Sequence, residues 1–203
     1  MKITSIKQQV KDQERVSIFV DGKYSFSLSL SEFVAEKLKN HQELSEADIK
    51  RLKKISEDGK MRLRALSWLL MRPHSVREFK DYLRRKKAEP ELAESLSREF
   101  NERKYLDDAA FAKWFSENRA RKNKSDRAIR SELFSKGVGR EVIDQVLGTE
   151  EKDETSRLKE LIAKKQKSAR YKNDSEKLAR YLVQQGFSWS LVKENLLNTR
   201  PED

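Results

Sequence analysis

The sequence predicts a mainly α-helical protein of tandem three-helix repeats, with a small β-hairpin or three-stranded sheet at its N-terminus. Only six of the 203 residues are Gly and three are Pro, a composition typical of helices. Apolar residues recur at helical spacing over most of the chain, which argues against disorder although 39% of the residues are charged. Three segments also align with one another at a nearly constant period.

The N-terminal part predicts a hairpin followed by two short helices. The stretch VSIFVDGKYSFSL (16–28) alternates around Asp21-Gly22, the favoured pair for a two-residue turn with positive φ at both positions. A hairpin alone is marginal in water, so we expect a third strand within Ile3–Val10 or the following helix to pack on it. The short helices are expected in 31–40 and 45–55, each beginning with Ser. The apolar positions of the hairpin are Val16, Ile18, Val20, Tyr24, Phe26 and Leu28.

The repeat is carried by SVREFKDYLRRKKAEPELAESL (75–96), SDRAIRSELFSKGVGREVIDQVL (125–147) and DSEKLARYLVQQGFSWSLVKENL (174–196). Spacings of 50 and 49 residues separate the corresponding positions. Another helix with an apolar face precedes each segment, so each repeat should contain three helices. We predict an N-terminal part over 1–59 and repeats over 60–104, 105–148 and 149–203. The corresponding apolar residues are Phe79, Ile129 and Leu178, then Leu83, Leu133 and Leu182.

The turn after the second helix of each repeat has a recognisable chemistry. Gly137 and Gly186 follow the last apolar position by four residues, where a helix ends with one left-handed residue. In the first repeat Lys87 stands in place of the glycine and Pro90 takes a helix-start position. We therefore expect the turn of the first repeat to be built differently.

Two adjacent acids, Asp107 and Asp108, stand before the helical run Phe111–Phe115. A divalent cation needs several converging oxygen ligands, which two neighbouring carboxylates do not supply alone. We interpret Asp107 as the helix cap, with Asp108 adding negative charge at the positive helix end.

Catalytic and metal-binding signals are weak. The chain has no cysteine, and neither His41 nor His74 has a second histidine near it in sequence, so we expect no metal, no cofactor and no enzyme. The absence of cysteine agrees with a reducing, cytoplasmic location. We expect no signal peptide and no membrane-spanning helix, because no apolar run is long enough.

Positive charge is the most informative chemical feature. The net charge is +11 with a pI of about 9.7, and residues 61–147 hold 21 basic against 14 acidic residues. Such a balance attracts polyanions, chiefly nucleic acid or an acidic protein surface.

Three basic clusters stand out: RRKK (84–87), RARKNKSDRAIR (119–130) and KKQKSARYK (164–172). The last two lie between the first and second helices of their repeats, so stacking would bring them to one face. A merely solvated charged face is the alternative for any single cluster. Tyr171 is suited either to base stacking or to core packing. The candidate binding residues are Arg72, Arg77, Arg84, Arg85, Arg121, Lys122, Lys124, Arg127, Lys164, Lys165 and Lys167.

Three of these stretches carry a family resemblance. RPHSVREFKDYLRRK (72–86), YLDDAAFAKWF (105–115) and IRSELFSKGVGREVIDQVL (129–147) resemble the RecX family, bacterial regulators of the recombinase RecA. The resemblance runs from about residue 60 to the C-terminus, and VDGKYSFSL resembles the N-terminal extension of some members. It implies an elongated, curved array of three-helix units.

The resemblance also implies a function without catalysis. Family members bind the RecA filament on DNA and inhibit its activities, including the SOS response, by blocking filament growth or promoting filament loss. We expect the RecA filament and single- and double-stranded DNA, through its phosphate backbone, as partners of a monomeric protein. A general DNA-binding module and a helical-repeat scaffold for another protein remain the alternatives.

Overall fold

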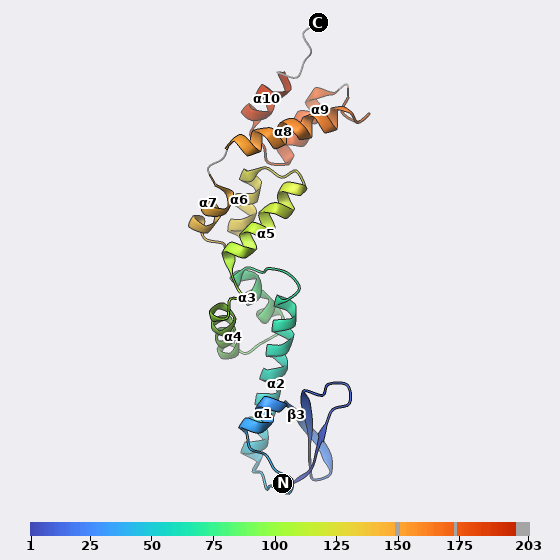
Figure 1. Ribbon diagram of the computed structural model, residues 1–203, viewed down its shortest axis with the longest axis vertical. Coiled ribbons are helices and arrows are strands. Elements are labelled where there is room, and N and C mark those ends of the chain that lie inside the picture. Colours follow the sequence, from blue (N-terminus) through green and yellow to red (C-terminus); the bar gives the residue numbers. More distant parts are fainter. Residues whose placement is uncertain (149–150, 173, 198–203) are drawn as a thin grey trace. The chain divides into compact units, whose positions relative to one another are not determined.

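The computed structural model describes residues 1–148, 151–172 and 174–197. The chain forms two compact units: Met1–Met71 with Lys87–Leu96, and Arg72–Lys86 with the chain from Ser97 onward. Figure 1 shows a small sheet and short helix in the first unit and a succession of helices in the second. The fold is mainly helical with one N-terminal sheet, as predicted.

Three antiparallel strands form the sheet in the order β1 (Ile3–Gln8), β2 (Arg15–Val20) and β3 (Lys23–Ser29). The predicted hairpin and third strand are confirmed, and Asp21 and Gly22 have φ angles of 48° and 80° in the turn. One hairpin expectation is wrong. The pairing shifts between Ile18 and Phe19, which places Tyr24 opposite Phe19 and leaves Tyr24 54% exposed.

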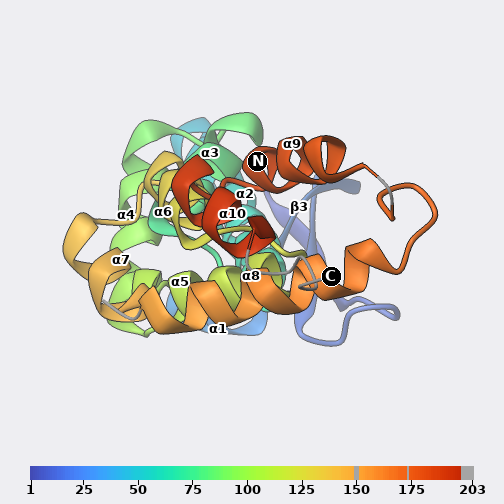
Figure 2. The same cartoon turned by 90° about the horizontal axis from the view of Figure 1, so that it is seen from above.

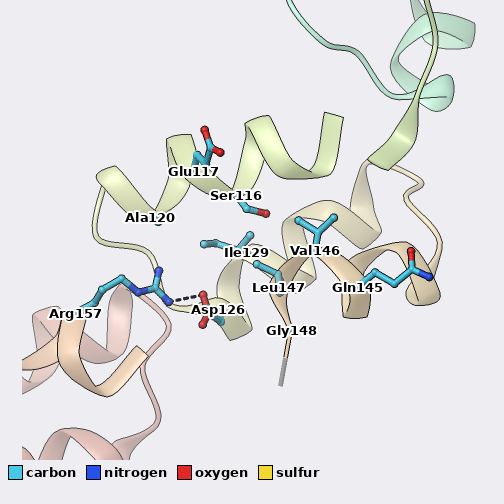
Figure 3. Close-up of a pocket in the computed structure, with 10 residues that line it drawn as sticks. All are labelled: Ser116, Glu117, Ala120, Asp126, Ile129, Gln145, Val146, Leu147, Gly148 and Arg157. Atoms are coloured by element: carbon cyan, nitrogen blue, oxygen red, sulfur yellow. Dashed lines mark hydrogen bonds and ion pairs between the residues drawn. The ribbon is translucent and has the colours of Figure 1, made fainter. Parts of the chain in front are cut away.

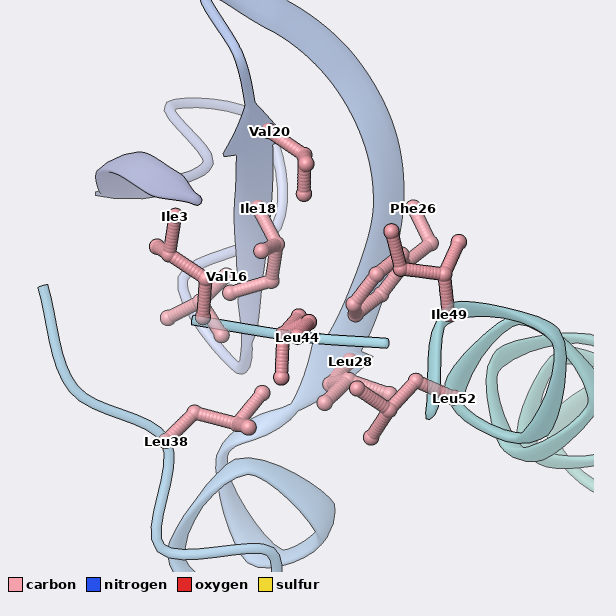
Figure 4. Packing of buried hydrophobic residues seen from close by; sticks show 10 residues of the cluster. All are labelled: Ile3, Val16, Ile18, Val20, Phe26, Leu28, Leu38, Leu44, Ile49 and Leu52. Atoms are coloured by element: carbon pink, nitrogen blue, oxygen red, sulfur yellow. The ribbon is translucent and has the colours of Figure 1, made fainter. Parts of the chain in front are cut away.

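The first unit buries one face of the sheet against the helical segments that follow (Figure 4). Helices α1 (Leu30–Ala35) and α2 (Glu46–Leu69) both begin with a capping box, at Ser29 and Ser45. The second expected helix is not short, because it continues through Gly59 to the apolar positions up to Leu69. The predicted start of the first repeat at residue 60 therefore falls inside α2. The buried cluster comprises Ile3, Val16, Ile18, Val20, Phe26, Leu28, Leu38, Leu44, Ile49 and Leu52.

Eight more helices follow, in the order that the repeat predicts. They are α3 (Val76–Arg85), α4 (Pro90–Glu102), α5 (Asp108–Arg121), α6 (Asp126–Ser135), α7 (Arg140–Leu147), α8 (Glu151–Gln166), α9 (Ser175–Gln184) and α10 (Trp189–Leu197). The six residues aligned between α3, α6 and α9 are all 1% exposed or less, which confirms the alignment. The predicted start of the third repeat, residue 149, lies outside the described residues.

Apolar clusters of the second unit include one that joins α5, α6 and α7 and another that joins α8, α9 and α10. Figures 1 and 2 show these helices from two sides. Tyr171 is 8% exposed and its ring lies 5.6 Å from that of Tyr181. The structure thus favours packing over base stacking for Tyr171. Trp114 is half-buried, and the centre of its ring lies 6.1 Å from that of Phe111.

The turns after α6 and α9 have the predicted geometry. Gly137 and Gly186 have φ angles of 81° and 101°, and the N–H of the following residue donates to Leu133 or Leu182 in each case. These are Schellman endings. The first repeat differs from the expectation in one respect, because Lys87 adopts the same left-handed conformation with φ 57°, whereas Pro90 begins α4 as predicted. A lysine tolerates the left-handed conformation at a modest backbone cost.

Candidate functional site

The second unit contains two joints between successive repeats, each built at the start of a repeat's second helix. In the first joint, Ser75 caps α3 and its hydroxyl donates to the carbonyl of Lys136, at the end of α6, over 2.8 Å. The N–H of Val76 donates to Asp108 Oδ1, at the start of α5, over 2.9 Å. The N-terminus of α3 therefore meets the C-terminus of α6, an arrangement that sets opposite partial charges side by side.

Asp108 places its negative charge in the first turn of α5, as predicted, and has a second role besides. Asp107 caps α5 as expected, because its Oδ1 accepts the N–H groups of Ala109 and Ala110 at 2.8 and 3.0 Å. Asp108 also accepts a hydrogen bond from the preceding repeat. Burial raises the pKa of its carboxyl, the Val76 N–H lowers it and the nearby Asp107 raises it further.

A charged network closes the first joint. Glu78 lies 3.0 Å from Arg72, 2.9 Å from Lys136 and 3.2 Å from Nδ1 of His74. Burial works to raise the pKa of Glu78, but the hydrogen bonds and charges of Lys136 and Arg72 outweigh it and hold the pKa below its usual value. The Arg72 guanidinium also lies 4.9 Å from the centre of the Trp114 ring, within the range of a cation–π interaction.

The second joint repeats this plan with other residues. The N–H of Ser125 donates to the carbonyl of Gln185, at the end of α9, over 3.0 Å. The N–H of Asp126 donates to Glu154 Oε1, on α8, over 2.9 Å, as Val76 does to Asp108. Burial raises the pKa of Glu154, partly offset by that same N–H.

Arg157 adds an ion pair to the second joint. Its guanidinium lies 2.5 Å from the carboxylate of Asp126, beside a pocket of about 430 Å³ (Figure 3). Figure 3 shows Arg157 of α8 reaching across to the start of α6. The ion pair therefore ties the third repeat to the second.

The two turn glycines are also packing residues. A Cβ at Gly137 would lie 2.7 Å from Cβ of Arg77, and a Cβ at Gly186 would lie 2.6 Å from Cβ of Ala128. Both distances are far shorter than van der Waals contact, so each glycine permits close approach to the preceding repeat as well as the left-handed turn.

The predicted binding residues occupy different environments. Arg72 belongs to the closed first joint, whereas Arg84 and Arg121 are exposed and pair with Asp81 and Glu117 on their own helices at 2.9 and 3.7 Å. Lys165 lies 4.8 Å from the centre of the Tyr181 ring. The other predicted residues with exposed side chains are Arg77, Arg85, Lys122, Arg127, Lys164 and Lys167.

The structure brings two of the predicted clusters together. A groove of about 210 Å³ lies between α5 and α8 in the second joint, and we call it the basic groove. Lys124, which is half-buried, comes from the second cluster, and Lys164 comes from the third. The groove is lined by Ala120, Arg121, Asn123, Lys124, Arg157, Glu160, Leu161, Lys164 and Phe187.

Sequence reasoning did not identify the joint residues Asp108, Glu154 and Arg157. The acids are separated from their N–H partners by about 30 residues, and no local pattern marks such a pairing. The recurring turn glycines were the available sign of the joints in the sequence. A turn position that excludes every side chain suggests that another part of the chain packs close to it.

The described ranges contain neither a metal-binding cluster nor a membrane-spanning helix. Among residues 1–148, 151–172 and 174–197, no three His, Asp or Glu side chains converge as a metal site would require. None of the helices found there has an apolar stretch long enough to span a bilayer.

Comparison with known proteins agrees with this architecture. Residues 1–45 match the family model of the regulatory protein RecX N-terminal domain, and residues 107–147 match that of the RecX second three-helix domain. A crystal structure of regulatory protein RecX superposes with a TM-score of 0.71 at 26% identity, covering 95% of this chain and 97% of the other. RecX from Lactobacillus salivarius, at 18% identity and a TM-score of 0.57, shares the fold over 70% of this chain and 95% of its own.

Curated sequences give similarity along nearly the whole chain. Regulatory protein RecX of Listeria innocua is 32% identical over 199 residues, which cover 95% of this chain and 74% of the relative. The protein of the same name from Bacillus licheniformis is 30% identical, covering 99% and 78%. With the two domain matches and the shared three-helix architecture, these identities show that the chain belongs to the RecX family of regulatory proteins.

Proposed function

We propose that this protein regulates the recombinase RecA by binding the RecA–DNA filament and inhibiting it, through blocked filament growth or promoted filament loss. It would thereby modulate recombination, DNA repair and the SOS response. The observation that carries the proposal is similarity over 95% of the chain to proteins named regulatory protein RecX. We propose that it acts by binding rather than by catalysis, as a monomer in the cytoplasm.

The joints supply a physical basis for such binding. Each one fixes the second helix of a repeat through hydrogen bonds to backbone groups and a half-buried carboxylate. Surface loops on a fixed scaffold can match regularly spaced sites on a polymer without first losing conformational entropy. We propose that the three repeats use their loops in this way on neighbouring filament subunits.

The basic residues supply the second part of the proposal. Arg77, Arg85, Lys122, Arg127 and Lys167 are exposed and are therefore available to DNA phosphate or to acidic protein surface. Binding through phosphate contacts releases counterions and should weaken steeply as salt rises. Arg72 is a weaker candidate, because Glu78 and Trp114 already contact its guanidinium.

A charge-reversal pair tests the proposal. The Lys122→Glu/Lys124→Glu variant should lose most of its inhibition of RecA ATPase on single-stranded DNA, while Lys113→Glu/Lys193→Glu changes net charge equally at exposed positions outside the basic groove. Both variants should retain the wild-type far-UV circular dichroism. Equal inhibition by the two variants would show that the basic cluster at 119–130 does not contribute to inhibition.

Two other functions give different results in the same assay. A general DNA-binding module would inhibit RecA only at concentrations where it also binds bare DNA. A scaffold for another protein would leave RecA ATPase unchanged at every salt concentration. Inhibition below the concentration that saturates bare DNA therefore supports direct contact with the filament.

A further inference from the structure

The two joints differ at equivalent positions. Arg72 and Lys122 each stand three residues before the serine that caps the second helix, and His74 and Lys124 stand one residue before it. Trp114 stands six residues after Asp108, the carboxylate that accepts the helix-start N–H.

Glu154 is the corresponding carboxylate of the second joint, and Glu160 stands six residues after it. An exposed acid thus replaces the large ring of the first joint.

In the first joint this region is filled. The Trp114 ring lies against the Arg72 guanidinium at 4.9 Å, and Glu78 neutralises Arg72 at 3.0 Å. His74 is 3% exposed beside them. The Arg72 side chain is therefore already engaged by a carboxylate and an aromatic ring.

In the second joint two of the equivalent residues, Lys124 and Glu160, line the basic groove. Asn123, with φ 60°, turns the chain after α5 in a left-handed conformation and leads into Lys124. Within the described parts of the chain, neither Lys124 nor Lys164 forms a side-chain hydrogen bond or ion pair, whereas Arg121 has one exposed partner, Glu117, at 3.7 Å. Four cations from two repeats, one of them the Arg157 that pairs with Asp126, therefore line a concavity that holds one acid, Glu160.

We propose that the basic groove binds a backbone phosphate of a nucleic acid, with Arg121, Lys124 and Lys164 as its contacts. This inference rests on the proposed function and assigns its nucleic-acid contact to one place. A phosphodiester offers a charged group with several oxygens in different directions, which suits donors that converge from α5, the following loop and α8. The lining presents no aromatic surface but that of Phe187, which is buried, so the groove reads the backbone and not the bases.

A phosphate in the groove would contact the second and third repeats together. It would therefore bind better when the joint is closed, and it would in turn stabilise the closed joint. Amide hydrogen exchange at the start of α6, where Asp126 meets Glu154 and Arg157, should slow when a dT oligonucleotide is added.

The direct test compares two variants of equal charge. Lys124→Gln/Lys164→Gln should bind a fluorescein-labelled dT oligonucleotide about 10-fold more weakly than Lys113→Gln/Lys193→Gln, and its salt slope should be smaller by about 1.4. Both should unfold in urea as the wild type does. Equal affinity and equal slope in the two variants would overturn the assignment.

Two substitutions of Glu160 distinguish binding in the basic groove from an effect of net charge alone. Glu160→Gln removes the one acid of the lining and should tighten binding. Glu160→Trp removes the same charge but supplies the ring that fills the first joint, and it should bind more weakly than Glu160→Gln. Equal tightening by both substitutions would show that only net charge matters, which would contradict the groove.

Two further comparisons distinguish phosphate binding in the basic groove from binding of acidic protein and from the proposed function. If a poly-glutamate chain of matching charge loses as much affinity as the oligonucleotide in Lys124→Gln/Lys164→Gln, the phosphate assignment is wrong and the groove serves acidic protein. If the wild type inhibits RecA while this variant binds DNA like its control, the inference fails and the proposed function stands. Groove-dependent DNA binding without RecA inhibition would support the inference and contradict the proposed function.

Discussion

Replacing Gly186 by alanine tests the joint between the second and third repeats. The substitution has two costs. A left-handed φ of 101° costs a residue with a Cβ about 1–2 kcal/mol. The new Cβ would also lie 2.6 Å from Cβ of Ala128 and 2.4 Å from Oγ of Ser125, and such overpacking costs about 1–3 kcal/mol. The free energy of unfolding should therefore fall by about 2–5 kcal/mol.

Gly22 provides the matched control. It has a φ of 80°, and a Cβ there would meet nothing within 4 Å. Gly22→Ala should therefore show the backbone cost alone, about 1–2 kcal/mol. Urea unfolding followed by far-UV circular dichroism gives both values, with hydrogen exchange of α6 and α9 to locate the loss.

A compensating change sharpens the test. Ala128→Gly should restore the share of the steric loss that the Ala128 methyl causes in the Gly186→Ala background, although glycine in a helix costs about 1 kcal/mol by itself. A double-mutant cycle isolates that coupling. The reasoning is refuted if Gly186→Ala destabilises no more than Gly22→Ala and shows no coupling to residue 128.

Three other substitutions test single contacts. Asp107→Ala removes the cap of α5 and should cost about 1 kcal/mol in urea unfolding. Lys87→Gly relieves a left-handed residue with φ 57° and should add about 1 kcal/mol. Asp108→Asn keeps an oxygen for the Val76 N–H but no longer titrates. Because the pKa of Asp108 is raised in the folded state, the wild type should gain stability over Asp108→Asn as pH falls from 7 to 4; a pH-independent difference would contradict the shift.

Much of the fold was predictable because it is encoded locally. Alternation around Asp21-Gly22 predicts the hairpin, and the helix caps and turn glycines recur at a fixed period. The failure at Lys87 has a simple reason. A missing glycine was interpreted as a different turn, yet the left-handed conformation costs a lysine little enough for the surrounding structure to impose it.

The joints were less predictable because their partners are remote in sequence. Charge counting does not distinguish Arg72 from Lys124. In the structure Glu78 and Trp114 contact Arg72, whereas Lys124 lines the basic groove. Which cation is available depends on the side chains that the next repeat brings to it. That information lies in tertiary packing and not in the density of basic residues.

The central claim is that this protein recognises RecA on DNA and does not simply bind a polyanion. Co-sedimentation with RecA-coated single-stranded DNA, in parallel with the same DNA uncoated and over a range of salt concentrations, measures that difference. The account predicts binding to the coated DNA at protein concentrations that leave bare DNA unoccupied. Equal binding to both, with the same dependence on salt, would contradict it.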